Sequence, residues 1–197
     1  MRIPAEFIRF AHNISILNMR FERLTSTENP LFGRGMELYG ISFPDHEQRE
    51  QDSQRIIMSH PDYQFNLIFD GNLFVGLMLC WETEKFIYVE HFCIIFPSLR
   101  NNSYGSRSLD LLSERGKTVI LEIDPPIDDI SIRRKGFYVR SGFVANPYRH
   151  AHPPYHKRYS PHNLVVMSKP AELTQNEYEW FNNYLAETVM SSKYPQI

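Results

Sequence analysis

The stretch from Phe86 to Arg115 contains the residues best suited to chemistry in this sequence. Glu90 stands in the middle of an apolar, β-prone run, Phe86–Ile95. A carboxylate inside a buried strand is costly unless it faces a wet cavity or an ionic partner. Glu90 is therefore either a catalytic base in a cavity or a glutamate paired with a nearby lysine or arginine. Glu122, in the apolar run Thr118–Ile123, is the second candidate for a base.

His91 follows Glu90 directly. In a regular strand, neighbouring side chains point to opposite faces of the sheet. We therefore expect His91 to lie away from any site that contains Glu90, and we interpret it as a structural histidine.

A loop of small polar residues, Arg100–Gly105, connects this strand to a helix that should run to about Arg115. The N-terminus of a helix presents unpaired backbone N–H groups and the positive end of the helix dipole. The arrangement predicts a site for the phosphates of a cofactor. The alternative is that Gly105 only closes a tight connection between strand and helix.

The segment Pro147–His162 is polar, rich in proline, and contains four histidines and three basic residues. No HxxxH pair on a helix and no cysteine pair accompanies these histidines, so we expect no metal site. The first expectation is a solvated loop. The second is a basic, aromatic surface for an acidic acceptor or a partner protein.

The elements that must position these residues begin with a strand at Asn18–Leu24, followed by helices at about Pro30–Tyr39 and Glu47–Ser59. Asp45 is the expected N-cap of the second helix. Two further strands, Gln64–Phe69 and Leu73–Trp81, flank an Asp-Gly-Asn turn, which is typical of a hairpin. Together with Phe86–Ile95 they predict three consecutive antiparallel strands.

The second half of the chain predicts a strand–helix–strand unit, which makes Phe86–Ile95 and Thr118–Ile123 a parallel pair. A helix over Ile130–Arg140 should be capped near Asp128 or Asp129. Strands are expected from Phe143 onward and over Asn163–Ser168. The last helix, Thr174–Val189, should open with a capping box between Thr174 and Glu177.

The composition is that of an ordinary soluble protein, with 197 residues, 42% apolar and 22% charged. We expect one domain over residues 18–197, an N-terminal extension over 1–17 and a C-terminal helical elaboration over 170–197. The net charge of −2 argues against nucleic acid and anionic lipid as partners. No apolar run reaches the ~18 residues of a spanning helix, and no secretory leader is visible, so a cytoplasmic location is expected.

Two motifs resemble those of a known superfamily. Residues 99–106 (LRNNSYGS) are similar to the acyl-CoA loop Arg/Gln-x-x-Gly-x-Gly/Ala of the GNAT acyltransferases. Residues 137–143 (FYVRSGF) resemble the Tyr-x-x-x-Gly-Phe signature of the same superfamily. The order of the predicted elements is also similar, and the resemblance covers roughly Asn18 to Ser168.

The resemblance implies an α+β (α/β) fold with a mixed, largely antiparallel central sheet, flanking helices and an extra C-terminal helix. It implies transfer of an acetyl group from acetyl-CoA, with coenzyme A as the carrier and no metal, to a primary amine of a small molecule or peptide. Attack would be direct, because neither Cys80 nor Cys93 lies in a recognisable nucleophile setting. The alternative is a non-catalytic acyl-CoA-binding or protein-interaction module. Exposed edge strands make a homodimer a reasonable expectation.

The resemblance also assigns roles to residues. Tyr138 would give a proton to the departing sulfur, and backbone N–H groups around Ile94 would stabilise the oxyanion. Glu90 is the candidate base for this reaction because of its place in the strand, with ion pairing as the open alternative. Ser103 replaces the first glycine of the loop motif, and its hydroxyl is expected to cap the helix. The predicted cofactor contacts are Ile94, Ile95, Phe96, Arg100, Asn101, Asn102, Ser103, Tyr104, Gly105, Ser106, Ser131, Arg134 and Tyr138. Among them, Ser131 is expected near the pantetheine and Arg134 near a phosphate.

Overall fold

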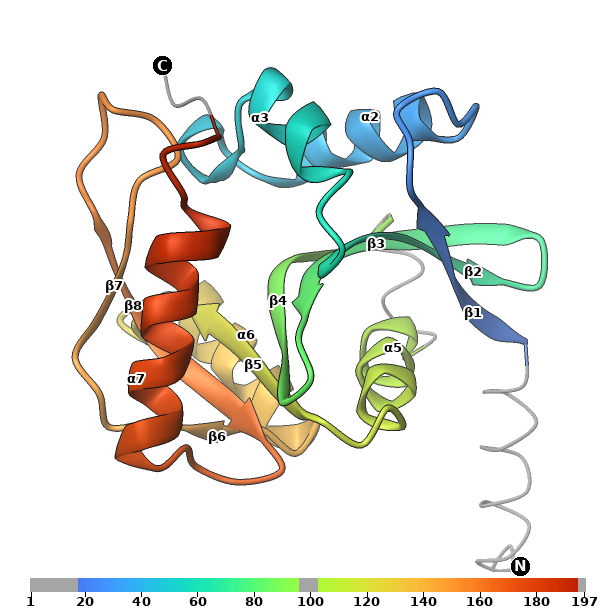
Figure 1. Ribbon diagram of the computed structural model, residues 1–197. Helices are drawn as coiled ribbons and strands as arrows, with labels where there is room; N and C mark the ends of the chain where they lie inside the picture. Colours follow the sequence, from blue (N-terminus) through green and yellow to red (C-terminus); the bar gives the residue numbers. More distant parts are fainter. Residues whose placement is uncertain (1–17, 96–102, 195–197) are drawn as a thin grey trace, which may run out of the picture.

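The computed structural model describes residues 18–95 and 103–194 and contains a mixed sheet (Figure 1). The strand order is β1-β2-β3-β4-β5-β8-β6, with β7 paired to β8. Only β4 and β5 run parallel; the other pairs are antiparallel. The predicted fold class is thereby confirmed. The strands are β1 (Met19–Leu24), β2 (Tyr63–Asp70), β3 (Leu73–Glu82), β4 (Phe86–Ile94), β5 (Thr118–Ile123), β6 (Val144–Ala145), β7 (His150–His152) and β8 (His162–Lys169).

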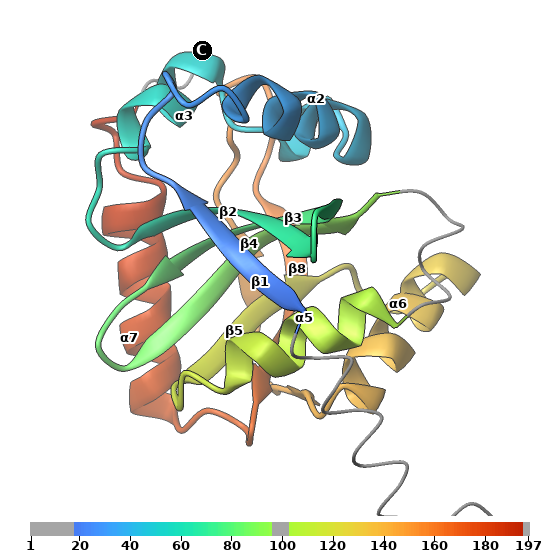
Figure 2. The same cartoon turned by 90° about the vertical axis from the view of Figure 1, so that its right-hand side faces the viewer.

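Helices cover both faces of the sheet (Figures 1 and 2). On one face α2, α3 and α7 enclose a core that includes Leu38, Ile57 and Phe181. On the other face α5 and α6 enclose a second core around Leu109 and Leu112. The helices are α2 (Phe32–Ser42), α3 (Gln51–Ile57), α5 (Tyr104–Ser113), α6 (Asp129–Arg140) and α7 (Gln175–Tyr184), with a 3₁₀ turn at Asp45–Glu47 and a π-helical turn at Leu185–Val189.

Three predictions that rest on local turn and cap chemistry are confirmed. Gly71 has a φ of +57° in the turn between β2 and β3, a backbone conformation that glycine adopts without steric cost. The Asp128 carboxylate accepts from the N–H groups of Ile130 and Ser131 and so begins α6. Thr174 forms the expected capping box at the start of α7. Each of these signals acts within four residues, so sequence alone identifies it.

Two predictions about the chain are wrong. Asp45 does not cap a helix: it lies in the 3₁₀ turn, and its carboxylate accepts hydrogen bonds from Arg158 and Tyr159. The segment 147–162 is not a solvated loop, because it contains β7 and buries His150, His152 and His156. In both cases a contact made far away in sequence decides the structure.

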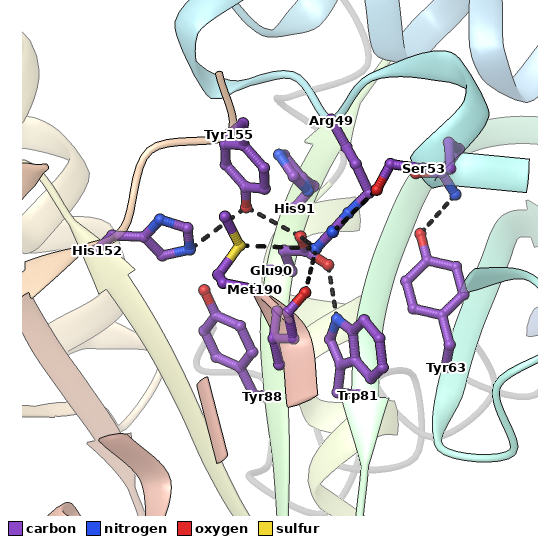
Figure 3. A network of polar contacts seen from close by, with 12 residues as sticks. Arg49, Ser53, Tyr63, Trp81, Tyr88, Glu90, His91, His152, Tyr155 and Met190 are labelled. Atoms are coloured by element: carbon purple, nitrogen blue, oxygen red, sulfur yellow. Dashed lines mark hydrogen bonds and ion pairs between the residues drawn. The ribbon is translucent and has the colours of Figure 1, made fainter. Parts of the chain in front are cut away.

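The most consequential feature is a bulge in β4. Leu79 of β3 lies opposite His91, and Cys80 lies opposite Val89, which leaves Glu90 as an extra residue. A bulge of this kind bends the strand and changes the alternation of its side chains. Glu90 and His91 consequently point to the same face, where both approach Tyr155 (Figure 3). The expectation that they occupy opposite faces is wrong.

Beyond the bulge, β4 separates from β5. Their parallel pairing extends from Phe86 opposite Thr118 to Val89 opposite Leu121. From Glu90 onward this edge of β4 has no partner strand among the described residues. The two strands therefore diverge in the middle of the sheet.

Residues 1–17, expected as an N-terminal extension, lie outside the described residues. Within the ranges 18–95 and 103–194, none of the helices combines the length and apolar character needed to cross a membrane.

Candidate active site

A cleft of about 1530 Å³ occupies the space where β4 and β5 diverge. Its walls come from the end of α2 and the 3₁₀ turn, from the start of α5, from α6 and from the segment around β7. Seven of the predicted site residues with cofactor roles line it: Arg134, which is described below, and Ile94, Ile95, Ser103, Gly105, Ser106 and Tyr138. The sequence therefore identified residues that the fold brings to one cleft, although they come from three separate elements.

The cleft edge of β4 offers backbone donors. The N–H of Ile95 donates to the carbonyl of Val75 on β3. Because backbone groups alternate between the two edges of an antiparallel strand, the N–H groups of Phe92 and Ile94 point to the opposite edge. That edge faces the cleft, where unpaired donors can stabilise a developing oxyanion.

The start of α5 closes one end of the cleft. Ser103 has a φ of +56° and a ψ of +20°, a left-handed conformation that disfavours residues other than glycine. Its hydroxyl makes no capping hydrogen bond, so the predicted cap is wrong. A Cβ on Gly105 would lie 3.0 Å from the Phe137 ring, so glycine here allows α5 to approach α6 closely. Phe96, Arg100, Asn101 and Asn102, also predicted to contact the cofactor, lie outside the described residues.

Three of the predicted contacts have other partners. Tyr104 is 7% exposed and packs into the core beneath α5. The Ser131 hydroxyl is part of the α6 capping box, where it accepts from the N–H groups of Ile127 and Asp128, so its predicted role near the pantetheine is not supported. Arg134 does line the cleft, but its guanidinium binds the Asp124 carboxylate at 2.7 Å.

Tyr138 lines the cleft as predicted, from the last part of α6. Its ring contacts Phe137 and Phe143 in edge-to-face geometry. Burial raises the pKa of its phenol to about 12. Tyr138 therefore keeps its proton at neutral pH and has it to donate.

Glu90 occupies a buried polar network (Figure 3). Its carboxylate accepts from Arg49 at 2.6 Å, from Trp81 at 2.7 Å and from Tyr155 at 2.9 Å. The side chains of Glu90 and Arg49 are 1% and 3% exposed. The same guanidinium also donates to the carbonyl of Val189 in the C-terminal π-helical turn.

This network gives Glu90 a structural role. Burial alone would raise the pKa of Glu90, but Arg49, His91 and the Trp81 hydrogen bond outweigh burial and lower the pKa to about 2. A carboxylate with such a pKa accepts a proton poorly at neutral pH, so Glu90 is not supported as the base. The alternative that the sequence left open, pairing with an arginine, describes it correctly.

Glu122 lies on β5, across the cleft from Glu90, and its environment differs. Its carboxylate accepts from the Tyr88 hydroxyl and from Nε2 of His150, and Nε2 of His152 lies 3.9 Å away. Burial raises the pKa of Glu122, yet His152 and His150 outweigh burial and lower it. Two imidazoles thus surround one carboxylate at the cleft floor.

His152 is the cleft residue that the sequence reasoning missed. It is 5% exposed, lines the cleft, and comes from β7. The sequence does carry a signal, because His150-Ala151-His152 has the period of two that places both imidazoles on one face of a strand. The prolines around it favoured a loop interpretation.

Comparison with known proteins was made by sequence and by structure. No protein-family model matches the sequence, and no curated protein matches it. Among solved structures, a protein of Bacteroides thetaiotaomicron assigned to the GNAT family of acetyltransferases is 30% identical, with a TM-score of 0.81. The match covers 87% of this chain and 98% of that chain.

More distant structures share the fold. Naa50 of Arabidopsis thaliana, in complex with the bisubstrate analogue CoA-Ac-MVNAL, is 14% identical with a TM-score of 0.51, over 77% of this chain and 98% of its own. An aminoglycoside 6'-N-acetyltransferase complexed with coenzyme A is 15% identical with a TM-score of 0.51, over 76% of this chain and 96% of its own.

The structural role of Glu90 generates a stability prediction. Arg49→Met removes the cation and leaves a buried carboxylate without its charge partner, which should lower the free energy of unfolding by about 3–5 kcal/mol. The double variant Arg49→Met/Glu90→Gln should recover part of that loss, because the uncompensated charge is gone. Urea unfolding followed by circular dichroism measures both effects.

The matched control is Arg158→Met, which breaks the exposed ion pair between Arg158 and Asp45. Exposed ion pairs contribute little, so its unfolding midpoint should stay close to that of the wild type. Equal stability of Arg49→Met and Arg158→Met would contradict a structural role for the Arg49–Glu90 pair.

Proposed function

This chain belongs to the GNAT family of acetyltransferases, and from that premise we propose that it transfers an acetyl group from acetyl-CoA to a primary amine of a small molecule or peptide by direct attack. The observation that carries the proposal is the divergence of β4 from β5 at the Glu90 bulge, which opens the cleft and leaves backbone donors along its edge. The chemistry then depends on what surrounds that edge.

The cleft has features that suit an acyl-CoA. The N-terminus of α5, where Gly105 and Ser106 line the cleft, offers N–H groups and a helix dipole to a pyrophosphate. The exposed edge of β4 from Phe92 to Ile95 can pair with the amide groups of a pantetheine arm, as an added strand would. When bound, acetyl-CoA supplies the activated acetyl group.

The proposed site supports both charges that develop during the transfer. The N–H groups of Phe92 and Ile94 would stabilise the oxyanion as the amine nitrogen bonds to the carbonyl carbon. Tyr138 would donate its proton as the C–S bond breaks, so that sulfur leaves as a thiol. The amine loses two protons overall; one replaces the proton that Tyr138 gave, and the other goes to solvent.

The first of these protons needs an acceptor, because a free alkyl amine has a pKa of about 10 and arrives protonated. We assign this role to His152. Its Nδ1–H donates to the carbonyl of Pro153 at 2.6 Å, which leaves Nε2 of the neutral ring with its lone pair. The Tyr155 hydroxyl, 3.5 Å from Nε2, gives its own proton to Glu90.

The Glu122 carboxylate supports the role of His152 as the proton acceptor. Its carboxylate lies 3.9 Å from Nε2 of His152 and is held in place by Tyr88 and His150. It would attract a substrate ammonium and would stabilise the imidazolium that forms when His152 takes the proton. Glu122 was the second candidate for the base in the sequence, and in this proposal it orients and stabilises rather than accepts.

The proposed function predicts that acetyl-CoA binds the folded protein and stabilises it. At a hundredfold excess over Kd the gain is about 2.7 kcal/mol, which a thermal melt detects as a rise in Tm. Release of coenzyme A thiol should then depend on an amine from a panel of alkylamines, polyamines, aminoglycosides and N-terminal peptides. The absence of any thermal shift at millimolar acetyl-CoA would contradict the proposal.

A shift without transfer to any amine of the panel would instead favour the second candidate, a non-catalytic acyl-CoA-binding module. The left-handed conformation of Ser103 at the start of α5 is the observation that keeps this candidate open.

Tyr138→Phe should lower kcat by about 10²–10⁴-fold and leave acetyl-CoA affinity nearly unchanged, because it removes only the donated proton. Steady-state kinetics and calorimetric titration measure the two quantities separately. The matched control is Tyr184→Phe at the end of α7, outside the cleft, which removes a partly buried hydroxyl that donates to Asp62. Equal kcat in Tyr138→Phe and the wild type would remove Tyr138 from the acid role.

His152→Gln should lower kcat/KM by about 10²–10⁴-fold. Steady-state kinetics with a fixed amine measure the loss, and calorimetric titration should show that acetyl-CoA affinity is nearly unchanged. His60→Gln, which changes a histidine that packs on Trp81 outside the cleft, is the control. A His152→Gln variant with the wild-type kcat/KM would show that the proton acceptor lies elsewhere.

A further inference from the structure

A second group of titratable side chains lines the cleft next to His152, which lies opposite His162 in the pairing of β7 with β8. One ring nitrogen each from His46 and His162 and one carboxylate oxygen from Glu47 all lie within 4.8 Å of one another. His46 and Glu47 belong to the 3₁₀ turn, and His162 begins β8. All three residues line the cleft.

We propose that His46, Glu47 and His162 bind a divalent transition-metal ion of the zinc class. Two imidazoles and one carboxylate are a donor set that zinc takes in proteins, with one position left for water or substrate. Around a tetrahedral ion with metal–donor distances near 2.0 Å, the donors stand about 3.3 Å apart. The observed separations need only small rotations of side chains that are partly exposed.

Charge supports a cation at this place. Asp124 brings a second carboxylate, with Oδ1 3.3 Å from Nε2 of His162. Arg134 binds the other oxygen of Asp124, at 2.7 Å, which leaves Oδ1 facing the histidine. A carboxylate beside a ligating imidazole is a frequent arrangement at metal sites, because it orients the ring and raises its basicity. Within the described residues, the ion-pair partner of Glu47 is the His46 imidazole, 3.6 Å away.

The position of the cluster gives it a consequence. The 3₁₀ turn and the start of β8 are neighbouring walls of the cleft, with the His46 and His162 ring centroids 6.1 Å apart. The segment between β7 and β8 also contacts the turn, where His156 and Tyr159 bind Asp45. A bound ion would join these walls at the end of the cleft that is lined by β7 and the 3₁₀ turn. Resting on the proposed function, zinc would therefore hinder entry of the amine rather than take part in the transfer.

Isothermal titration of the untagged, chelator-treated full chain with ZnCl₂ tests the site without any activity measurement. We expect one equivalent to bind, with affinity reduced at least 10–100-fold in both His46→Ala and His162→Ala. Both positions are more than 40% exposed at the side chain, so the variants should fold as the wild type does. His60→Ala is the matched control and should bind zinc as the wild type does.

A wild-type protein that binds no zinc, or variants that bind it as tightly as the wild type, would overturn the proposal and leave the cluster as an ion-pair network between two walls. Cobalt substitution gives a second readout, since a tetrahedral site produces intense visible absorption bands that His162→Ala should lack. If the protein binds zinc but transfers acetyl to no amine, the metal site stands and the proposed function fails. Transfer that zinc leaves unaffected would overturn the effect on amine entry.

Discussion

The bulge in β4 gives that strand one residue more than β3, and the extra residue is Glu90. The Glu90 side chain is 1% exposed, so its negative charge needs a positively charged partner. Arg49 supplies the charge from the segment that precedes α3, and its guanidinium also binds the end of the C-terminal helical region through Val189. The bulge, the α2–α3 segment and the C-terminus are thereby fixed to one another. A buried pair of this kind is costly to break, so the bend in β4 is held in one geometry.

The bend decides where binding can occur. Backbone donors that would otherwise pair β4 with β5 are left along an open edge at Phe92 and Ile94, and the start of α5 adds further donors at one end. Anionic groups can therefore be bound mostly by the main chain. This is consistent with a protein whose net charge is −2 and whose cleft needs no dense cluster of lysine or arginine.

The elements of this fold were predictable where the information is local. The hairpin at Gly71 and the cap at Asp128 depend on neighbouring residues, and β5 was located to the residue. The bulge was not predictable, because it depends on the register of β3 against β4. Nor was the partner of Glu90, since Arg49 is 41 residues away in sequence. The motif resemblance pointed to Tyr138, which lines the cleft, and to Ser131, whose hydroxyl belongs to the helix cap.

Glu90 and Glu122 show how environment separates two carboxylates of one cleft. Both are buried, and both have a lowered pKa, but the causes differ. The partner of Glu90 is a guanidinium, which keeps its proton at any physiological pH, so this pair is fixed. The partners of Glu122 are imidazoles, whose neutral rings carry one nitrogen with a lone pair. In the proposed mechanism the amine therefore gives its proton to the β5–β7 side of the cleft, Tyr138 of α6 donates to sulfur, and β4 contributes its bend and its backbone.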